Sequence, residues 1–140
     1  LTTLALEALE HLQPRFMIVN FQDPDYVHWG NPTHYTQAIA IIDDGIRQLV
    51  EATDRLPAYR GNTVVVVVPD CGRDDNRFQR VPFQHHFNSR SAHEIFAFFR
   101  GPGIRSNRIF HDPVDQIDVT RTLGELAGIA TPHAEGVSLV

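Results

Sequence analysis

The sequence centres on Thr63-Val-Val-Val-Val-Val-Pro-Asp-Cys-Gly-Arg73, in which a run of valines precedes a proline and a carboxylate. Valine is β-branched, and an unbroken apolar run is typical of a strand buried on both faces, in the middle of a parallel or mixed sheet. In open α/β sheets, ligands bind beyond the carboxyl ends of the strands. The pattern therefore makes Asp70, which follows the valine run, a candidate functional residue.

The composition is that of a single globular domain, which we expect to span 1–140. Hydrophobic residues make up 42% and charged residues 21%, as in ordinary soluble proteins. The net charge of −5 and the lack of a Lys/Arg run argue against a nucleic-acid partner. No segment reaches the roughly 20 apolar residues of a membrane helix, so no membrane partner is expected. No signal-peptide pattern opens the chain, and the localisation stays open.

Hydrophobic periodicity predicts that strands alternate with helices along the chain. Helices are expected over 4–12, over 33–55 with Thr33 as the N-cap, and over 119–126. Strands are expected over 15–21, 63–68 and 94–100. The polar segment 72–93 is long for a connection in a compact domain, which favours a functional loop. This alternation predicts an α/β fold, an αβα sandwich with a largely parallel central sheet.

Polar clusters accompany the expected strands, and their residue types are those of metal ligands. The clusters are Asp23, Asp25 and His28; Asp70 and Cys71; and His85 and His86. Asp and His with one soft sulfur ligand suit Zn²⁺ or a similar divalent cation, whereas Mg²⁺ and Ca²⁺ prefer all-oxygen shells. Two such cations can polarise a phosphoryl or sulfuryl oxygen and generate a nucleophile at neutral pH. The sequence therefore predicts a divalent-metal site.

Each of these residues also has an ordinary structural explanation. An Asp-Pro-Asp segment forms turns readily, and Asp70 can cap the turn after its strand. Cys71 can be an inert buried thiol. Adjacent side chains rarely point the same way, so one member of the pair His85 and His86 is expected to face solvent. Arg73 can bind an anionic substrate bidentately, or it can be a solvated loop residue.

The order of these motifs resembles the carboxyl-terminal half of the alkaline phosphatase superfamily, and within it the sulfatase-like and type I phosphodiesterase-like proteins. Phe21-Gln-Asp-Pro-Asp-Tyr-Val-His28 is similar to the loop whose Asp and His bind one metal. Val68-Pro-Asp-Cys-Gly-Arg73 stands where the family has Asp-His-Gly. His86 precedes Glu94-Ile-Phe-Ala-Phe-Phe-Arg-Gly-Pro-Gly-Ile104 as the family's late metal-binding His does. Gly136-Val-Ser-Leu139 is similar to its Gly-x-Ser-Leu tail.

The resemblance implies an alkaline phosphatase-like sandwich, of which this chain is the carboxyl-terminal portion, and hydrolysis of a small anionic sulfate or phosphate ester. It implies one or two divalent metal ions, Zn²⁺ foremost, with Ca²⁺, Mg²⁺ or Mn²⁺ as alternatives. The implied ligands are Asp25, His28 and His86 for one metal and Asp70 with Cys71 for the other. Asp23 and His85 are the alternatives to Asp25 and His86. Arg73 is the expected substrate-binding residue, because its guanidinium can bind an anion bidentately.

Departures from the family pattern limit these expectations. The family's nucleophile belongs to an amino-terminal half, so no catalytic nucleophile is expected in this chain and the 140 residues alone are expected to be inactive. Cys71 stands at a metal-binding His position and either preserves, tunes or abolishes the second site. The alternative is a degenerate, non-catalytic member that acts in binding or scaffolding. Resemblance to exported sulfatases favours a periplasmic or secreted location.

Overall fold

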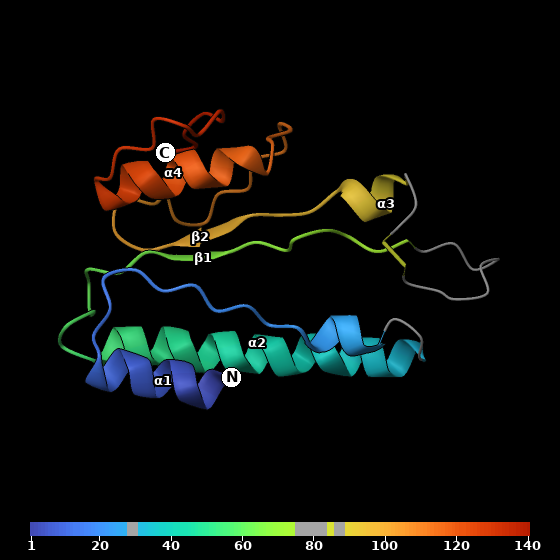
Figure 1. Ribbon diagram of the computed structural model, residues 1–140, viewed down its shortest axis with the longest axis horizontal. Helices are drawn as coiled ribbons and strands as arrows, with labels where there is room; N and C mark the ends of the chain where they lie inside the picture. The colour runs from blue at the N-terminus through green and yellow to red at the C-terminus, as the bar shows by residue number, and fades with distance from the viewer. Residues whose placement is uncertain (28–30, 75–83, 86–88) are drawn as a thin grey trace. The chain divides into compact units, whose positions relative to one another are not determined.

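The computed structural model describes residues 1–27, 31–74, 84–85 and 89–140, and the chain divides into two compact units, Leu1–Phe99 and Arg100–Val140 (Figure 1). The described elements are α1 (Thr2–His11), the 3₁₀-helix η1 (Asp23–Val27), α2 (Pro32–Arg55), β1 (Val65–Val67), α3 (Arg90–His93), β2 (Phe98–Arg100) and α4 (Ile117–Ala127). None of these helices is long and apolar enough to cross a membrane.

The predicted αβα sandwich with a largely parallel central sheet is wrong. The described part of the chain is mostly helical, and its sheet is a single antiparallel pair, β1 with β2. Parallel strands need a long crossover, which is usually an α-helix. The helix described between β1 and β2 is α3, which has only 4 residues. The chain after β1 therefore returns in the opposite direction, as Figure 1 shows.

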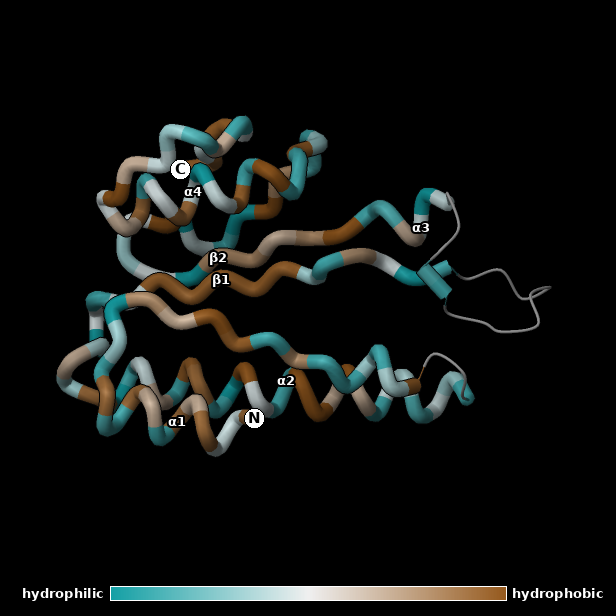
Figure 2. Tube along the Cα trace, viewed as in Figure 1, coloured by the Kyte–Doolittle hydropathy of each residue, from teal (hydrophilic) through white to brown (hydrophobic). Residues whose placement is uncertain are grey.

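The strands are also shorter and less buried than predicted. β1 covers Val65–Val67, and all three valines are half-buried. Residues 15–21 form no strand, and only Phe98–Arg100 of the segment 94–100 is paired. Phe98 is 50% exposed. In Figure 2 the tube is brown along β1, which marks its residues as hydrophobic. A run of β-branched valines favours extended backbone, but burial on both faces requires layers that a two-stranded sheet does not supply.

The first unit is built on α2, which α1 and η1 both contact. The predicted helix over 33–55 is confirmed, but its N-cap is Asn31 rather than Thr33. Asn31 Oδ1 accepts the backbone N–H of Thr33 at 2.7 Å, and Pro32 occupies the first helical position. The buried positions of α1 and α2 include small residues, Ala5, Ala38 and Ala52. Small side chains at these positions let α1 and α2 approach closely.

The second unit is held together by the buried face of α4. Asp118 accepts the backbone N–H groups of Asp115 at 2.9 Å and Val137 at 2.8 Å. Thr122, which is fully buried, accepts the N–H of Leu139 at 3.0 Å. Gly128 ends the helix in the left-handed conformation at φ 66°, as its position predicts. The tail around Gly136-Val-Ser-Leu139 is therefore bonded to α4 by two side chains.

Candidate functional site

The candidate site lies in the first unit, where three loops meet at the start of α2. Asp25 lies in η1, and Tyr35 lies in the first turn of α2. The segment Asp70–Arg73 follows β1, and His85 lies 14 positions beyond Cys71. Two backbone bonds hold the segment after β1 in place: the N–H of Gly72 donates to Ala92 at 2.8 Å, and that of Asp74 donates to Gln84 at 2.7 Å. These bonds bring Cys71 and His85 to the same place.

The centre of the site is a contact between Cys71 and His85. Their Sγ and Nδ1 atoms lie 3.1 Å apart, which is a hydrogen-bond distance for sulfur. Arg73 Nη1 donates to the same sulfur at 3.2 Å. Asp70 Oδ1 accepts the backbone N–H of Cys71 at 2.9 Å, and the same carboxylate also lies beside the thiol.

Arg73 joins this centre to η1. Its Nη2 lies 2.8 Å from Asp25 Oδ1, and its side chain is only 11% exposed, whereas that of Asp25 is 53% exposed. The third donor of the guanidinium, Nε, is buried and has no hydrogen-bond partner among the described residues. A buried N–H without an acceptor is costly, so Nε is a position at which an acceptor atom would be favourable.

Burial dominates the electrostatics of the site. Burial raises the pKa of the Cys71 thiol above its ordinary value, and the carboxylate of Asp70 raises it further, while Arg73 opposes both. Burial likewise raises the pKa of Tyr35, against the effect of Arg73, which also donates a hydrogen bond to the tyrosine oxygen. Cys71 is therefore a protonated thiol at neutral pH, and its S–H can donate to Nδ1 of His85.

The structure brings together some of the predicted residues and leaves others untested. Asp25, Cys71, Arg73 and the alternative ligand His85 lie in one cluster. Asp23 is the first residue of η1. His28 and His86 lie outside the described residues. Tyr35 belongs to the cluster and was not predicted, because its position fits the apolar periodicity of the helix. Its place in the first turn after an Asp-rich loop is the signal that could have found it.

The chemistry of the donor pair fits zinc. Tetrahedral Zn²⁺ with Zn–S near 2.3 Å and Zn–N near 2.0–2.1 Å places sulfur and nitrogen about 3.6 Å apart. Cys71 Sγ and His85 Nδ1, at 3.1 Å, need to separate by only about half an ångström to reach that spacing. Within the described ranges, no three His, Cys, Asp or Glu side chains converge as a metal site requires. Among these residues, Asp25 and Cys71 are each bonded to the guanidinium of Arg73.

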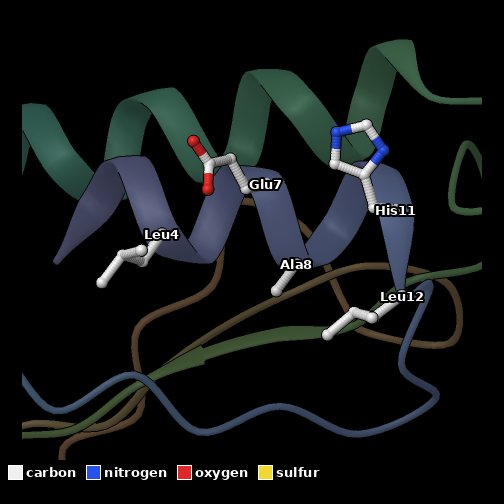
Figure 3. A pocket seen from close by; sticks show the side chains of 5 residues that line it. All are labelled: Leu4, Glu7, Ala8, His11 and Leu12. Carbon is white, nitrogen blue, oxygen red and sulfur yellow. The ribbon is translucent and has the colours of Figure 1, made fainter.

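A surface pocket lies elsewhere in the first unit, on α1. It is lined by Leu4, Glu7, Ala8, His11 and Leu12 (Figure 3). Leu4, Ala8 and Leu12 lie on one side of the helix, and Leu4 and Leu12 are 67% and 78% exposed. None of the predicted site residues lines this pocket. It is an apolar stripe with one carboxylate and one imidazole beside it, and it contains no donor set for a metal or an anion.

Comparison with known proteins does not extend this description. No known protein family, curated protein or solved structure matches the chain.

Proposed function

We propose that this chain supplies the metal-binding and anion-binding residues of a hydrolase of sulfate or phosphate esters. One observation carries the proposal: residues from three separate motifs meet at one point. Asp25 lies 48 positions before Arg73, and Cys71 lies 14 positions before His85, yet all four are linked by contacts of 2.8–3.2 Å. The motif order that resembles the sulfatase-like proteins supports the assignment. The fold does not, because the expected parallel sheet is absent from the described residues.

The pair Cys71 and His85 would hold the metal ion. Thiolate and imidazole together select Zn²⁺ over Mg²⁺ and Ca²⁺. Arg73 links the carboxylate of Asp25 to this pair, and His28 and His86 belong to the motifs of Asp25 and His85. When bound, such a metal supplies the positive charge that polarises an ester oxygen.

The protein's own donors would bind the anionic part of the ester. Arg73 offers a planar set of N–H groups that matches the oxygens of a sulfate or phosphate group. Its Nε already lacks an acceptor among the described residues. Tyr35 lies beside the same guanidinium, which donates a hydrogen bond to its oxygen. The nucleophile of the reaction is assigned to no residue of this chain.

The proposal is tested by metal content and zinc titration of the purified protein. We expect near-stoichiometric Zn²⁺, and we expect Cys71→Ser and His85→Gln each to weaken zinc binding at least tenfold. His11→Gln is the matched control, because His11 lies on α1 and touches none of the site residues. A protein that binds no zinc, or whose affinity is unchanged in both site variants, would contradict the proposal.

The same titration separates a working site from a decayed one. Cys71→His replaces the thiol by the imidazole that the resembled family carries at this position. If only the variant binds zinc, the site has decayed, and the non-catalytic alternative, binding or scaffolding, is favoured. If the parent binds zinc and the loaded protein then binds inorganic sulfate or phosphate, the hydrolase is favoured. Whichever anion binds with the higher affinity, sulfate or phosphate, indicates the ester class.

A further inference from the structure

Helix α1 has a second apolar side besides the one that it buries. Ala5 and Leu9 are buried, and α1 contacts α2. Leu4, Ala8 and Leu12 follow one another at four-residue intervals on another side, where they line the surface pocket (Figure 3). The two exposed leucines stand on either side of the smaller alanine. The stripe is therefore a shallow hollow with a leucine at each end.

A carboxylate and an imidazole flank this stripe. Glu7 and His11 are exposed, line the same pocket and lie four residues apart, which places them on one flank of the helix (Figure 3). Glu10 of α1 is bonded to Arg55 of α2 at 3.0 Å. In the described part of the chain, by contrast, neither Glu7 nor His11 has an ion-pair partner. Both groups can therefore meet a charge on another molecule.

The stripe is complementary to a second copy of itself in the antiparallel direction. When Ala8 of one copy meets Ala8 of the other at a two-fold axis, Leu4 of each copy lies level with Leu12 of the other. Glu7 then lies two residues, or about 3 Å along the helix, from the level of the second copy's His11. A two-fold axis perpendicular to both helices keeps the two charged flanks on the same side, so each carboxylate faces an imidazole. The small central residue lets the two helices approach closely.

We propose that this stripe is a homodimer interface, in which α1 of one copy packs antiparallel against α1 of a second copy. A second copy is the occupant because one surface then supplies both the leucines and the opposite charges that the stripe requires. The inference goes beyond the proposed function and concerns a different surface. The helix has 10 residues and is about 15 Å long, whereas a stable interface buries about 800 Å² per partner. The association is therefore weak and depends on concentration.

The first experiment is sedimentation equilibrium of the purified chain from about 10 µM to about 1 mM. We expect the average mass to rise from that of one copy toward that of two, and we expect Leu4→Lys to weaken the association at least tenfold. Ile129→Lys is the matched control, because Ile129 is 60% exposed and does not line the pocket. A parent that stays monomeric at every concentration would overturn the proposal, and so would a Leu4→Lys protein that associates as the parent does.

A charge exchange tests the antiparallel direction. Glu7→Lys removes the carboxylate that faces the second copy's His11, and we expect it to weaken the association several-fold. Adding His11→Glu to the same chain restores the opposite charges in reversed order. We expect the double variant to associate at least as tightly as the parent. A double variant that associates no better than Glu7→Lys alone would overturn the proposed pairing.

Disulfide cross-linking tests the meeting point of the two helices. Ala8→Cys is combined with Cys71→Ser, so that the introduced thiol is the only one in the chain. We expect mild oxidation to give covalent dimers, because the two-fold axis brings the introduced thiols together. Thr3→Cys in the same background is the control, since Thr3 is exposed but does not line the pocket, and we expect it to give several-fold fewer dimers. Equal yields at the two positions would overturn the proposal.

Discussion

The sulfur of Cys71 lies 3.1 Å from Nδ1 of His85, although 14 positions separate the two residues along the chain. This contact depends on Gly72, whose N–H donates to Ala92 at 2.8 Å. A Cβ atom at position 72 would overlap the backbone oxygen of Ser91. The chain after β1 can therefore approach the segment before α3 only because residue 72 has no side chain.

Gly72→Ala is expected to disturb the site and the unit that contains it. The added methyl group must push two backbone segments apart, which costs about 1–3 kcal/mol in tightly packed regions. Urea unfolding should show the lower free energy of unfolding, and zinc affinity should fall with it. Gly61→Ala is the control: its Cβ would have no atom within 4 Å, so only its left-handed backbone at φ 71° adds a cost, of about 1–2 kcal/mol. A Gly72→Ala protein with unchanged zinc affinity would contradict the dependence.

The pKa of the single thiol is expected to respond to its two charged neighbours in opposite directions. Burial and Asp70 raise it and Arg73 lowers it, so Asp70→Asn should lower the pKa and Arg73→Met should raise it. The rate of iodoacetamide alkylation against pH, measured on chelator-treated protein, reports this value directly, because Cys71 is the only cysteine. Identical profiles in the parent and in both variants would contradict the geometry around the sulfur.

The same raised pKa has a consequence for stability. The folded protein holds the thiol proton more tightly than the unfolded chain does, so folding is favoured below the ordinary thiol pKa of about 8.5. This contribution is lost as the pH rises through the folded-state pKa. Urea unfolding at pH 7 and pH 9.5 should therefore show a loss of stability that is smaller in Cys71→Ala than in the parent.

Asn31→Ala is expected to destabilise the first unit by about 1 kcal/mol, which is the usual cost of losing an N-cap. The side chain of Asn31 accepts the N–H of Thr33, and the variant leaves that donor without its partner. Thermal or urea unfolding measures the difference. Thr33→Ala is the matched control, and it should change the free energy of unfolding by less than half as much. Equal changes in the free energy of unfolding at the two positions would show that Thr33 also contributes to the cap.

Asp118→Ala is expected to lower the free energy of unfolding of the second unit by roughly 3 kcal/mol, because two backbone N–H groups lose a charged acceptor. Hydrogen exchange should show the amide of Val137 exchanging faster, since its bond to Asp118 spans 19 positions. Asp112→Ala, at an exposed position, should stay within about 0.5 kcal/mol of the parent. Unchanged exchange at Val137 would show that the tail is held by other contacts.

The sequence determined the helices, because their signals are local. Apolar spacing predicted α1, α2 and α4, and Gly128 marked the end of α4. The N-cap of α2 was misplaced by two residues, since Asn31 and Thr33 are both good capping residues and only the backbone conformation selects one. Several site residues could also be recognised from residue type alone, because Asp, Cys, Arg and His are the types that bind metals and anions. These residues are Asp25, Cys71, Arg73 and His85.

Only the tertiary structure decided the pairing of strands and the contacts within the site. The valine run specifies extended backbone, but the choice of partner strand and its direction depends on residues far away along the chain, so the predicted parallel sheet was wrong. In the same way, no local pattern places Arg73 between Asp25 and Cys71, or Tyr35 beside it. Those contacts join segments up to 48 positions apart, so they depend on how the chain folds back and not on any local pattern.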